Sequence, residues 1–288
     1  MRKLKEFIIE KLVLICGLAS IFFVILIFLF LLKEGLAVFK TVSLFKFLFG
    51  KSWYPISEPA QLGILPLILG SLLVTLGAAI ISIPIGVACA IYIAEIAPLK
   101  TKETLKAGIE LLAAIPSVVL GFIGMVTLVP LVKNIFYLPT GLTALSGSIM
   151  LAFMAMPTIV SIAEDALYSI PKTYKEGALA LGATHWQTIW RVMLPAASSG
   201  ILAAVMLGIG RVIGETMAVM MITGNAAVIP HSILAPVRTL TATIAAEMGE
   251  AVVGSEHYFA LFAIGIVLFI ISFAINVTAD LFLHKRQQ

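Results

Sequence analysis

Residues 12–32 read LVLICGLASIFFVILIFLFLL, a run of twenty-one residues that contains no charged side chain. An α-helix needs about 20 apolar residues to cross a bilayer core that is about 30 Å thick, so this run predicts a membrane-spanning helix. The basic segment MRKLKEFIIEK precedes it, as in a signal peptide. However, the apolar run is longer than a signal peptide needs, and no cleavage site of small residues follows it. We therefore expect an uncleaved first span.

The whole chain shares this apolar character. Of its 288 residues, 61% are hydrophobic and 12% are charged, and the mean hydropathy is +1.12. Soluble domains are about 45–50% apolar and about 25% charged. The apolar runs are continuous and do not alternate at every second residue, which favours helices over a barrel of strands. We expect an all-α membrane protein with about six spans, at residues 12–32, 67–97, 107–131, 142–163, 196–222 and 259–283.

Lysine and arginine in the connections predict the orientation, because basic residues are retained on the cytoplasmic side. If the N-terminus is cytoplasmic, the inner segments hold twelve of them: Arg2, Lys3, Lys5, Lys11, Lys100, Lys102, Lys106, Lys172, Lys175, Arg191, Lys285 and Arg286. The outer segments then hold six: Lys33, Lys40, Lys46, Lys51, Lys133 and Arg238. We expect both termini to be cytoplasmic, which requires an even number of spans.

The long inner connection contains KTYKEGALALGATHWQTIWRVMLP at residues 172–195. Residues 173–181 favour a helix, and Gly182 interrupts it. Beyond the glycine, four apolar residues recur at the spacing of one helical face: Trp186, Ile189, Trp190 and Met193. Periodicity alone allows two interpretations, a knob that a soluble partner holds in a groove and an amphipathic pair of helices on the membrane surface.

The fifth expected span contains two opposite charges, Arg211 and Glu215. A charge at the bilayer centre costs about 2.5–3.5 kcal/mol on insertion scales, so it marks a functional site by default. The spacing of four residues predicts that both lie on one face of a helix. Either they form an ion pair that holds helices together, or they form an anion site on a permeation path.

The chemistry of the two side chains favours the anion site. Arginine stays charged and donates to two oxygens of an oxyanion at once. An ionised glutamate only accepts hydrogen bonds, so it suits an oxyanion that still carries a proton. Phosphate near neutral pH is protonated and sulfate is not. We expect Arg211 to hold phosphate transiently, and Glu215 to hold Arg211 between passages and to accept the phosphate proton.

The 172–195 segment resembles the docking motif of binding-protein-dependent ABC importer permeases. That motif reads Glu-Ala-Ala, three residues, Gly, nine residues, Ile-x-Leu-Pro, and the matching residues are Glu176, Gly177, Ala178, Gly182, Val192, Leu194 and Pro195. Gly177 and Val192 depart mildly from it. The resemblance implies a type I permease bundle in which residues 176–182 form a coupling helix that docks on an ATPase subunit.

A second resemblance covers roughly residues 60–285. The stretch GRVIGETMAVMMITGN is similar to that of the PstC-type permease subunit of bacterial phosphate importers, with matches at Arg211, Gly214, Glu215, Thr216, Met217, Ala218 and Val219. The resemblance implies that Arg211, Glu215 and Thr216 line the substrate path. It also implies a PstA-like second permease subunit, a PstB-like ATPase dimer, a PstS-like phosphate-binding protein, and a location in the bacterial inner membrane.

This chain itself is not expected to be an enzyme. Gly50-Lys51-Ser52 resembles the end of a P-loop, but the loop's first glycine would fall at Phe45. No cluster of metal ligands and no nucleophile with a base is apparent, so ATP and Mg²⁺ are assigned to the partner ATPase. We divide the chain into residues 1–65, with the first span, and residues 66–288, the permease core.

The remaining acidic residues are expected to be solvated. Glu95, Glu164 and Asp165 are placed at cytoplasmic helix ends, and Glu247, Glu250 and Glu256 make the last external loop acidic. Three alternative functions remain. A permease for another oxyanion, such as sulfate or molybdate, would share the docking motif, whereas a secondary transporter or channel would need neither that motif nor an ATPase. A regulatory membrane protein would sense phosphate through the same complex, as a second role of the chain.

Overall fold

A computed structural model describes residues 2–285, and almost all of its regular structure is helical. The first part of the chain contains α1 (Arg2–Leu36), α2 (Leu44–Phe49), β1 (Trp53–Tyr54), β2 (Gln61–Leu62), α3 (Leu65–Ile91), α4 (Leu99–Ala114) and α5 (Ser117–Ile135). The second contains α6 (Ala144–Tyr168), α7 (Lys172–Ala180), α8 (His185–Thr188), α9 (Leu194–Ala196), α10 (Ser198–Gly214), α11 (Met217–Ile222), α12 (Leu240–Glu247) and α13 (Glu256–Lys285). Short 3₁₀ or π turns connect some of them: Ala37–Lys40, Tyr92–Ile96 and Ile189–Met193.

The expected number of spans is confirmed. In the described part of the chain, five helical segments are long and apolar enough to cross a membrane: Ile9–Lys40, Leu65–Ile96, Ser117–Ile135, Ala144–Tyr168 and Glu256–Thr278. A sixth span results if His185–Ala196 and Ser198–Gly214, which meet at a bend of 70°, are counted together. The chain is therefore an all-α, multi-pass membrane protein.

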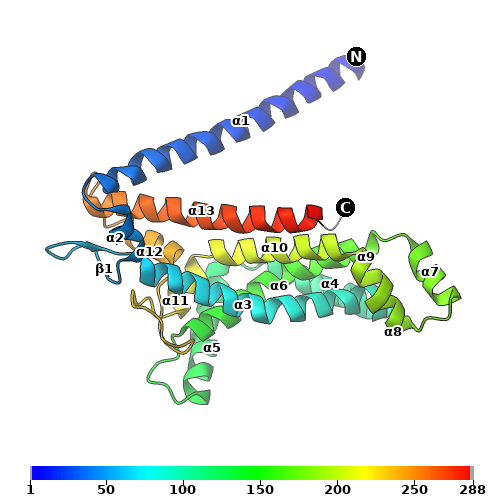
Figure 1. The fold of residues 1–288 in the computed structure, drawn as a ribbon. Helices are drawn as coiled ribbons and strands as arrows, with labels where there is room; N and C mark the ends of the chain where they lie inside the picture. Colours follow the sequence, from blue (N-terminus) through cyan, green and yellow to red (C-terminus); the bar gives the residue numbers. More distant parts are fainter. Residues whose placement is uncertain (1, 286–288) are drawn as a thin grey trace.

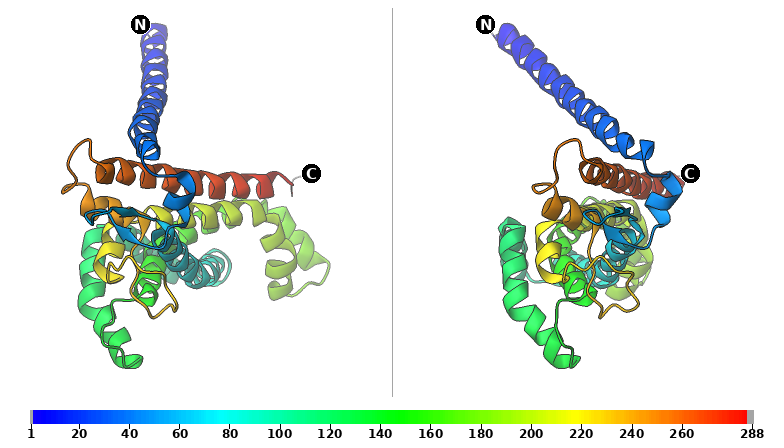
Figure 2. Two further views of the ribbon diagram at one scale, coloured as in Figure 1. Left: turned by 60° about the vertical axis from the view of Figure 1, so that its left-hand side comes forward. Right: turned by 90° about the vertical axis from the view of Figure 1, so that its left-hand side faces the viewer.

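The helices form a bundle with two different ends (Figure 1). Helices α3, α6, α10 and α13 run side by side, with α7 and α8 at one end and the β1–β2 hairpin, α11 and α12 at the other. Helix α1 leans away from the bundle (Figure 2), and its side chains are exposed over most of its length. The start of α1 and the end of α13 both point toward the end that carries α7.

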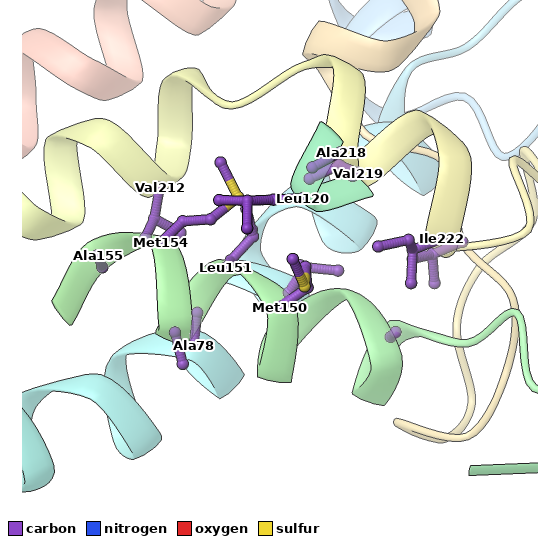
Figure 3. Close-up of a cluster of buried hydrophobic side chains, with 14 of the residues drawn as sticks. Ala78, Leu120, Met150, Leu151, Met154, Ala155, Val212, Ala218, Val219 and Ile222 are labelled. Carbon is purple, nitrogen blue, oxygen red and sulfur yellow. The ribbon is translucent and has the colours of Figure 1, made fainter. Parts of the chain in front are cut away.

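Small residues let the central helices approach closely. Ile159 of α6 is fully buried, and a Cβ atom at either Gly86 of α3 or Gly208 of α10 would lie within 2.8 Å of it. Glycine allows such approach between membrane helices because no side chain separates the backbones. Around this contact, α6 supplies Met150, Leu151 and Met154 to a core shared with α3, α5, α10 and α11 (Figure 3).

The third span differs from its prediction. The sequence predicts one helix over residues 107–131, but α4 ends at Ala114 and α5 begins at Ser117. Ile115 is extended, with ψ 128°, because the ring of a following proline disfavours the helical conformation of the residue before it. The break at Pro116 separates a charged, exposed helix, α4, from an apolar one, α5.

Candidate functional site

The fifth span is also interrupted, and the interruption lies at the expected substrate site. Helix α10 ends at Gly214, Glu215 is extended with φ −68° and ψ 132°, and α11 begins at Met217. The prediction of a continuous helix over residues 196–222, with Arg211 and Glu215 on one of its faces, is therefore wrong. Glu215 lies outside both helices. It therefore does not continue the helical face of Arg211 by one turn.

Hydrogen bonds compensate for the backbone groups that the break leaves without helical partners. The hydroxyl of Thr241, on α12, donates to the carbonyl oxygen of Glu215 at 2.8 Å. The Glu215 carboxylate accepts from the backbone N–H of Ala218 at 3.3 Å, and the Thr216 hydroxyl donates to the Gly214 carbonyl at 3.2 Å. Unpaired backbone groups at membrane depth are costly, so these contacts stabilise the interruption.

Arg211 lies in the last turn of α10, and its side chain is exposed on the surface of this single chain. Its Nη1 donates to the hydroxyl of Thr158 on α6 at 3.4 Å, which is a weak contact. Among the described residues no ion pair joins Arg211 to Glu215. The guanidinium thus keeps most of its donors available for an anion.

The coupling segment forms at the opposite end from the hairpin, close to where the sequence places it. The predicted helix over residues 173–181 is observed as α7, Lys172–Ala180. Gly182, with φ +82°, ends it, and the N–H groups of Gly182 and Ala183 bond to the carbonyls of Leu179 and Ala178. This is a Schellman motif, which requires a left-handed residue that glycine adopts at little cost.

The residues of the docking motif lie on an open surface. Glu176, Gly177 and Gly182 are exposed, and Ala178 is half-buried. A Cβ atom at Gly177 or Gly182 would meet no heavy atom within 4 Å. A soluble partner can therefore approach α7 closely.

The predicted apolar face beyond Gly182 is only partly correct. Ile189 and Met193 are buried against the bundle, whereas Trp186 and Trp190 are 57% and 53% exposed. The two indoles contact each other edge to face, with their centroids 5.8 Å apart. The two indoles and the buried pair therefore lie on different sides of this segment, which contains a π turn at Ile189–Met193.

Two acidic residues at the α7 end are buried, contrary to the prediction that they are solvated. Glu164 of α6 is 2% exposed and lies 3.5 Å from Nζ of Lys102 and 3.1 Å from Nζ of Lys106, both on α4. The hydrogen bond that the Lys106 ammonium donates to the Glu164 carboxylate raises the pKa of Lys106 above its ordinary 10.5. Glu95 pairs with Lys175 of α7, and its side chain is 8% exposed.

A third acidic residue, Glu247, anchors the hairpin end of the bundle, where the sequence predicts a solvated loop. Its carboxylate accepts from the Trp53 indole at 3.0 Å, contacts His257 Nε2 at 2.9 Å and pairs with Arg238. These groups line a cavity of about 580 Å³. Trp53 is 194 positions away, so no local sequence signal indicates the contact.

The chain matches the model of the family "Binding-protein-dependent transport system inner membrane component" over residues 82–287. It is 43% identical over 274 residues to the probable ABC transporter permease protein YqgH of Bacillus subtilis, covering 94% of this chain and 89% of the relative. It is 36% identical over 260 residues to the phosphate transport system permease protein PstC of Mesorhizobium japonicum, covering 84% of this chain and 79% of the relative.

Solved structures show the same fold. A bacterial alginate ABC transporter chain superposes with a TM-score of 0.66 at 17% identity, covering 94% of this chain and 93% of that one. An inward-facing MetNI methionine ABC transporter chain gives a TM-score of 0.62 at 21% identity, covering 81% of this chain and all of that one. With the family match and the two curated relatives, these likenesses show that the chain belongs to the family of binding-protein-dependent transport system inner membrane components.

Proposed function

We propose that the chain is a permease subunit of an ATP-driven importer that carries phosphate across the bacterial inner membrane. The observation that carries the proposal is the exposed guanidinium of Arg211 in the last turn of α10, where the helix ends before the extended residue Glu215. Several relatives at 34–36% identity, including one from Haemophilus influenzae, are phosphate transport system permease proteins. Their function supports phosphate as the anion at Arg211.

The geometry revises the expected role of Glu215. Because Glu215 lies outside α10, it does not hold Arg211 between passages in this conformation. Its Oε1 accepts from Ala218, and its other oxygen has no protein donor among the described residues. We infer that this oxygen accepts the proton of a phosphate held by Arg211. Sulfate lacks such a proton near neutral pH, and an ionised carboxylate repels it.

Energy for transport is assigned to a separate ATPase, which would bind ATP and Mg²⁺ and hold the exposed surface of α7 around Glu176 and Gly182. The family description and the ABC transporter neighbours support association with an ATPase and a binding protein. In detail we propose a PstA-like second permease subunit, a PstB-like ATPase dimer and a PstS-like phosphate-binding protein. In this scheme the chain itself performs no covalent chemistry.

The proposed orientation puts α7 and both termini on the cytoplasmic side. The start of α1 and the end of α13 point toward the same end of the bundle as α7 (Figure 1), which supports this assignment. The excess of basic residues in the connections at that end also supports it. The hairpin, α12 and the cavity at Glu247 would then face the binding protein.

One uptake assay under several conditions tests the proposal. Phosphate uptake is measured in proteoliposomes that contain the full chain and its partner subunits, with and without ATP, and with excess sulfate or molybdate. We expect ATP-dependent uptake that the competitors leave unchanged and that Arg211→Ala abolishes while the protein still inserts. Uptake that sulfate or molybdate suppresses would instead indicate a permease for another oxyanion, and uptake without ATP would indicate a secondary transporter or channel.

A further inference from the structure

Helix α7 stands apart from the membrane bundle. None of its residues is buried, and a cavity of about 370 Å³ separates it from the ends of α3 and α6. The cavity is lined by apolar residues that include Ala94, Leu167 and Leu179 and by the charged side chains of Glu95 and Lys175. Close packing transmits displacement between rigid elements, and a cavity of this size interrupts it.

One ion pair bridges this gap. Nζ of Lys175, on α7, donates to Oε2 of Glu95, and the two side chains are 34% and 8% exposed. Glu95 lies in the π turn Tyr92–Ile96, at the corner where α3 gives way to α4. A π turn in an otherwise α-helical segment is often found at functional sites. A movement of Lys175 therefore acts on the corner that joins two helices of the core.

From this corner, α4 leads to a second set of ion pairs. Lys102 and Lys106 of α4 both reach the buried carboxylate of Glu164 on α6, and Lys102 also lies 3.6 Å from the centroid of the Tyr168 ring. Glu164 is less than two helical turns from Thr158, whose hydroxyl accepts from Arg211. Two sets of ion pairs and the helices α4 and α6 thus connect α7 physically to the part of α6 that packs against α10, the helix of Arg211.

We propose that Lys175 and Glu95 are positioning residues that couple the movement of α7 to the membrane core. This inference rests on the proposed function, because it assumes that an ATPase moves α7. The pair suits the role because it is directional and because the Glu95 side chain is largely shielded from water, which strengthens its attraction to the opposite charge. Neither residue contacts the substrate or the nucleotide in this scheme. Each acts through the helices that it joins.

The first test reports coupling without reference to the substrate. In a background with Cys16→Ser and Cys89→Ser, a cysteine replaces Leu207, an exposed residue one turn before Arg211 on α10. The rate of its labelling by a thiol reagent is measured in the complex with the partner ATPase, with and without ATP. We expect ATP to change this rate in the parent, and Glu95→Gln or Lys175→Gln to reduce the change at least about fivefold, the lower end of usual coupling between sites.

The exchanged pair, Glu95→Lys with Lys175→Glu, restores opposite charges at the same distance. We expect it to recover most of the response to ATP, while Lys172→Gln, which removes an exposed positive charge from the same helix, leaves the response unchanged. A role limited to stability would lower the melting temperature of both single variants and leave the response of the folded complex intact. Intact responses in both single variants, or an exchanged pair as impaired as they are, would overturn the inference.

The second measurement separates this inference from the proposed function. The same variants are assayed for phosphate uptake and ATP hydrolysis, and we expect the single variants to hydrolyse ATP while carrying fewer phosphates for each ATP. If the parent responds to ATP in the labelling assay but carries no phosphate, the substrate assignment is wrong and the coupling role stands. If the parent carries phosphate but the single variants keep the parental ratio, the coupling role is wrong and the function stands.

Discussion

Nη1 of Arg211 lies 3.4 Å from the hydroxyl oxygen of Thr158, so a weak hydrogen bond is the contact that the guanidinium makes with α6. A contact at this distance holds the guanidinium loosely. The arginine can therefore give up Thr158 for an anion at little cost.

Arg211→Lys keeps the positive charge but loses the planar fork that donates to two oxygens at once. A hydrogen bond to a charged group contributes about 1.5–3 kcal/mol, so we expect phosphate uptake to fall about ten- to hundredfold. Thr158→Val is the matched control, because it removes the weak contact and leaves the guanidinium in place. A Thr158→Val variant as impaired as Arg211→Lys would show that the arginine acts through α6 and not on the anion.

Glu215→Gln tests the acceptor role of the carboxylate. The glutamine oxygen can still accept from the Ala218 N–H, so the interruption should survive, but the negative charge that repels a fully deprotonated anion is gone. We expect sulfate to compete with phosphate in the variant and not in the parent. Glu250→Gln, at an exposed position just after α12, controls for the loss of one negative charge. Unchanged exclusion of sulfate in the Glu215→Gln variant would contradict the role assigned here.

The sequence predicts the spans well because a bilayer imposes a length and an apolar composition on each helix. It predicts the interruptions poorly. Composition does not reveal that the chain breaks at Pro116 between α4 and α5. It also does not reveal that the Thr241 hydroxyl donates a hydrogen bond to the Glu215 carbonyl, which has no helical partner. Hydropathy reports where a helix is stable in lipid, and such breaks depend on partners that are distant in the sequence.

The same reason explains the misplaced acidic residues. Glu95, Glu164 and Glu247 all lie near helix ends, where charges are usually solvated. Their burial depends on cations that other elements supply: Lys175 from α7, Lys102 and Lys106 from α4, and Arg238 from the segment before α12. Spacing along one helix cannot reveal these contacts. The docking motif was predictable, by contrast, because residues 176–195 form a local pattern.

Gly182→Ala tests the end of α7. The left-handed conformation at φ +82° costs a residue with a side chain roughly 1–2 kcal/mol, so we expect the Schellman turn to weaken. The yield of partner ATPase that copurifies with the permease should fall. Gly177→Ala is the control on the same segment, since its Cβ meets nothing within 4 Å and alanine favours the helix by about 1 kcal/mol. Equal ATPase yields from the two variants would show that this turn does not set the docking surface.

Glu247→Gln tests the contacts at the opposite end. The amide removes the charge that faces Arg238, and it replaces one acceptor oxygen with a donor beside Trp53 and His257. Leaving a partly buried charged group without its partner costs about 1–3 kcal/mol. We expect a lower melting temperature of the purified protein and a red-shifted emission of Trp53, measured in a Trp186→Phe, Trp190→Phe background. Glu250→Gln should change neither, and a Glu247→Gln variant that behaves like this control would show that the carboxylate adds no stability.

Gly208→Ala tests the packing that brings α10 onto α6. Its Cβ would lie 2.5 Å from Cγ1 of Ile159, which is fully buried and is also confined by Gly86. Overpacking of this kind typically costs about 1–3 kcal/mol, so we expect a lower melting temperature. Gly210→Ala, two residues along the same helix, meets no atom within 4 Å and should not be destabilising.

Ile159→Ala removes the group that clashes with the new methyl group of Gly208→Ala. The double variant Gly208→Ala, Ile159→Ala should therefore lose less stability than the sum of the two single changes, with an interaction free energy of about 0.5–3 kcal/mol. Strictly additive losses would mean that α10 accommodates the methyl group by moving away from α6, and Arg211 and Thr158 would then separate as well.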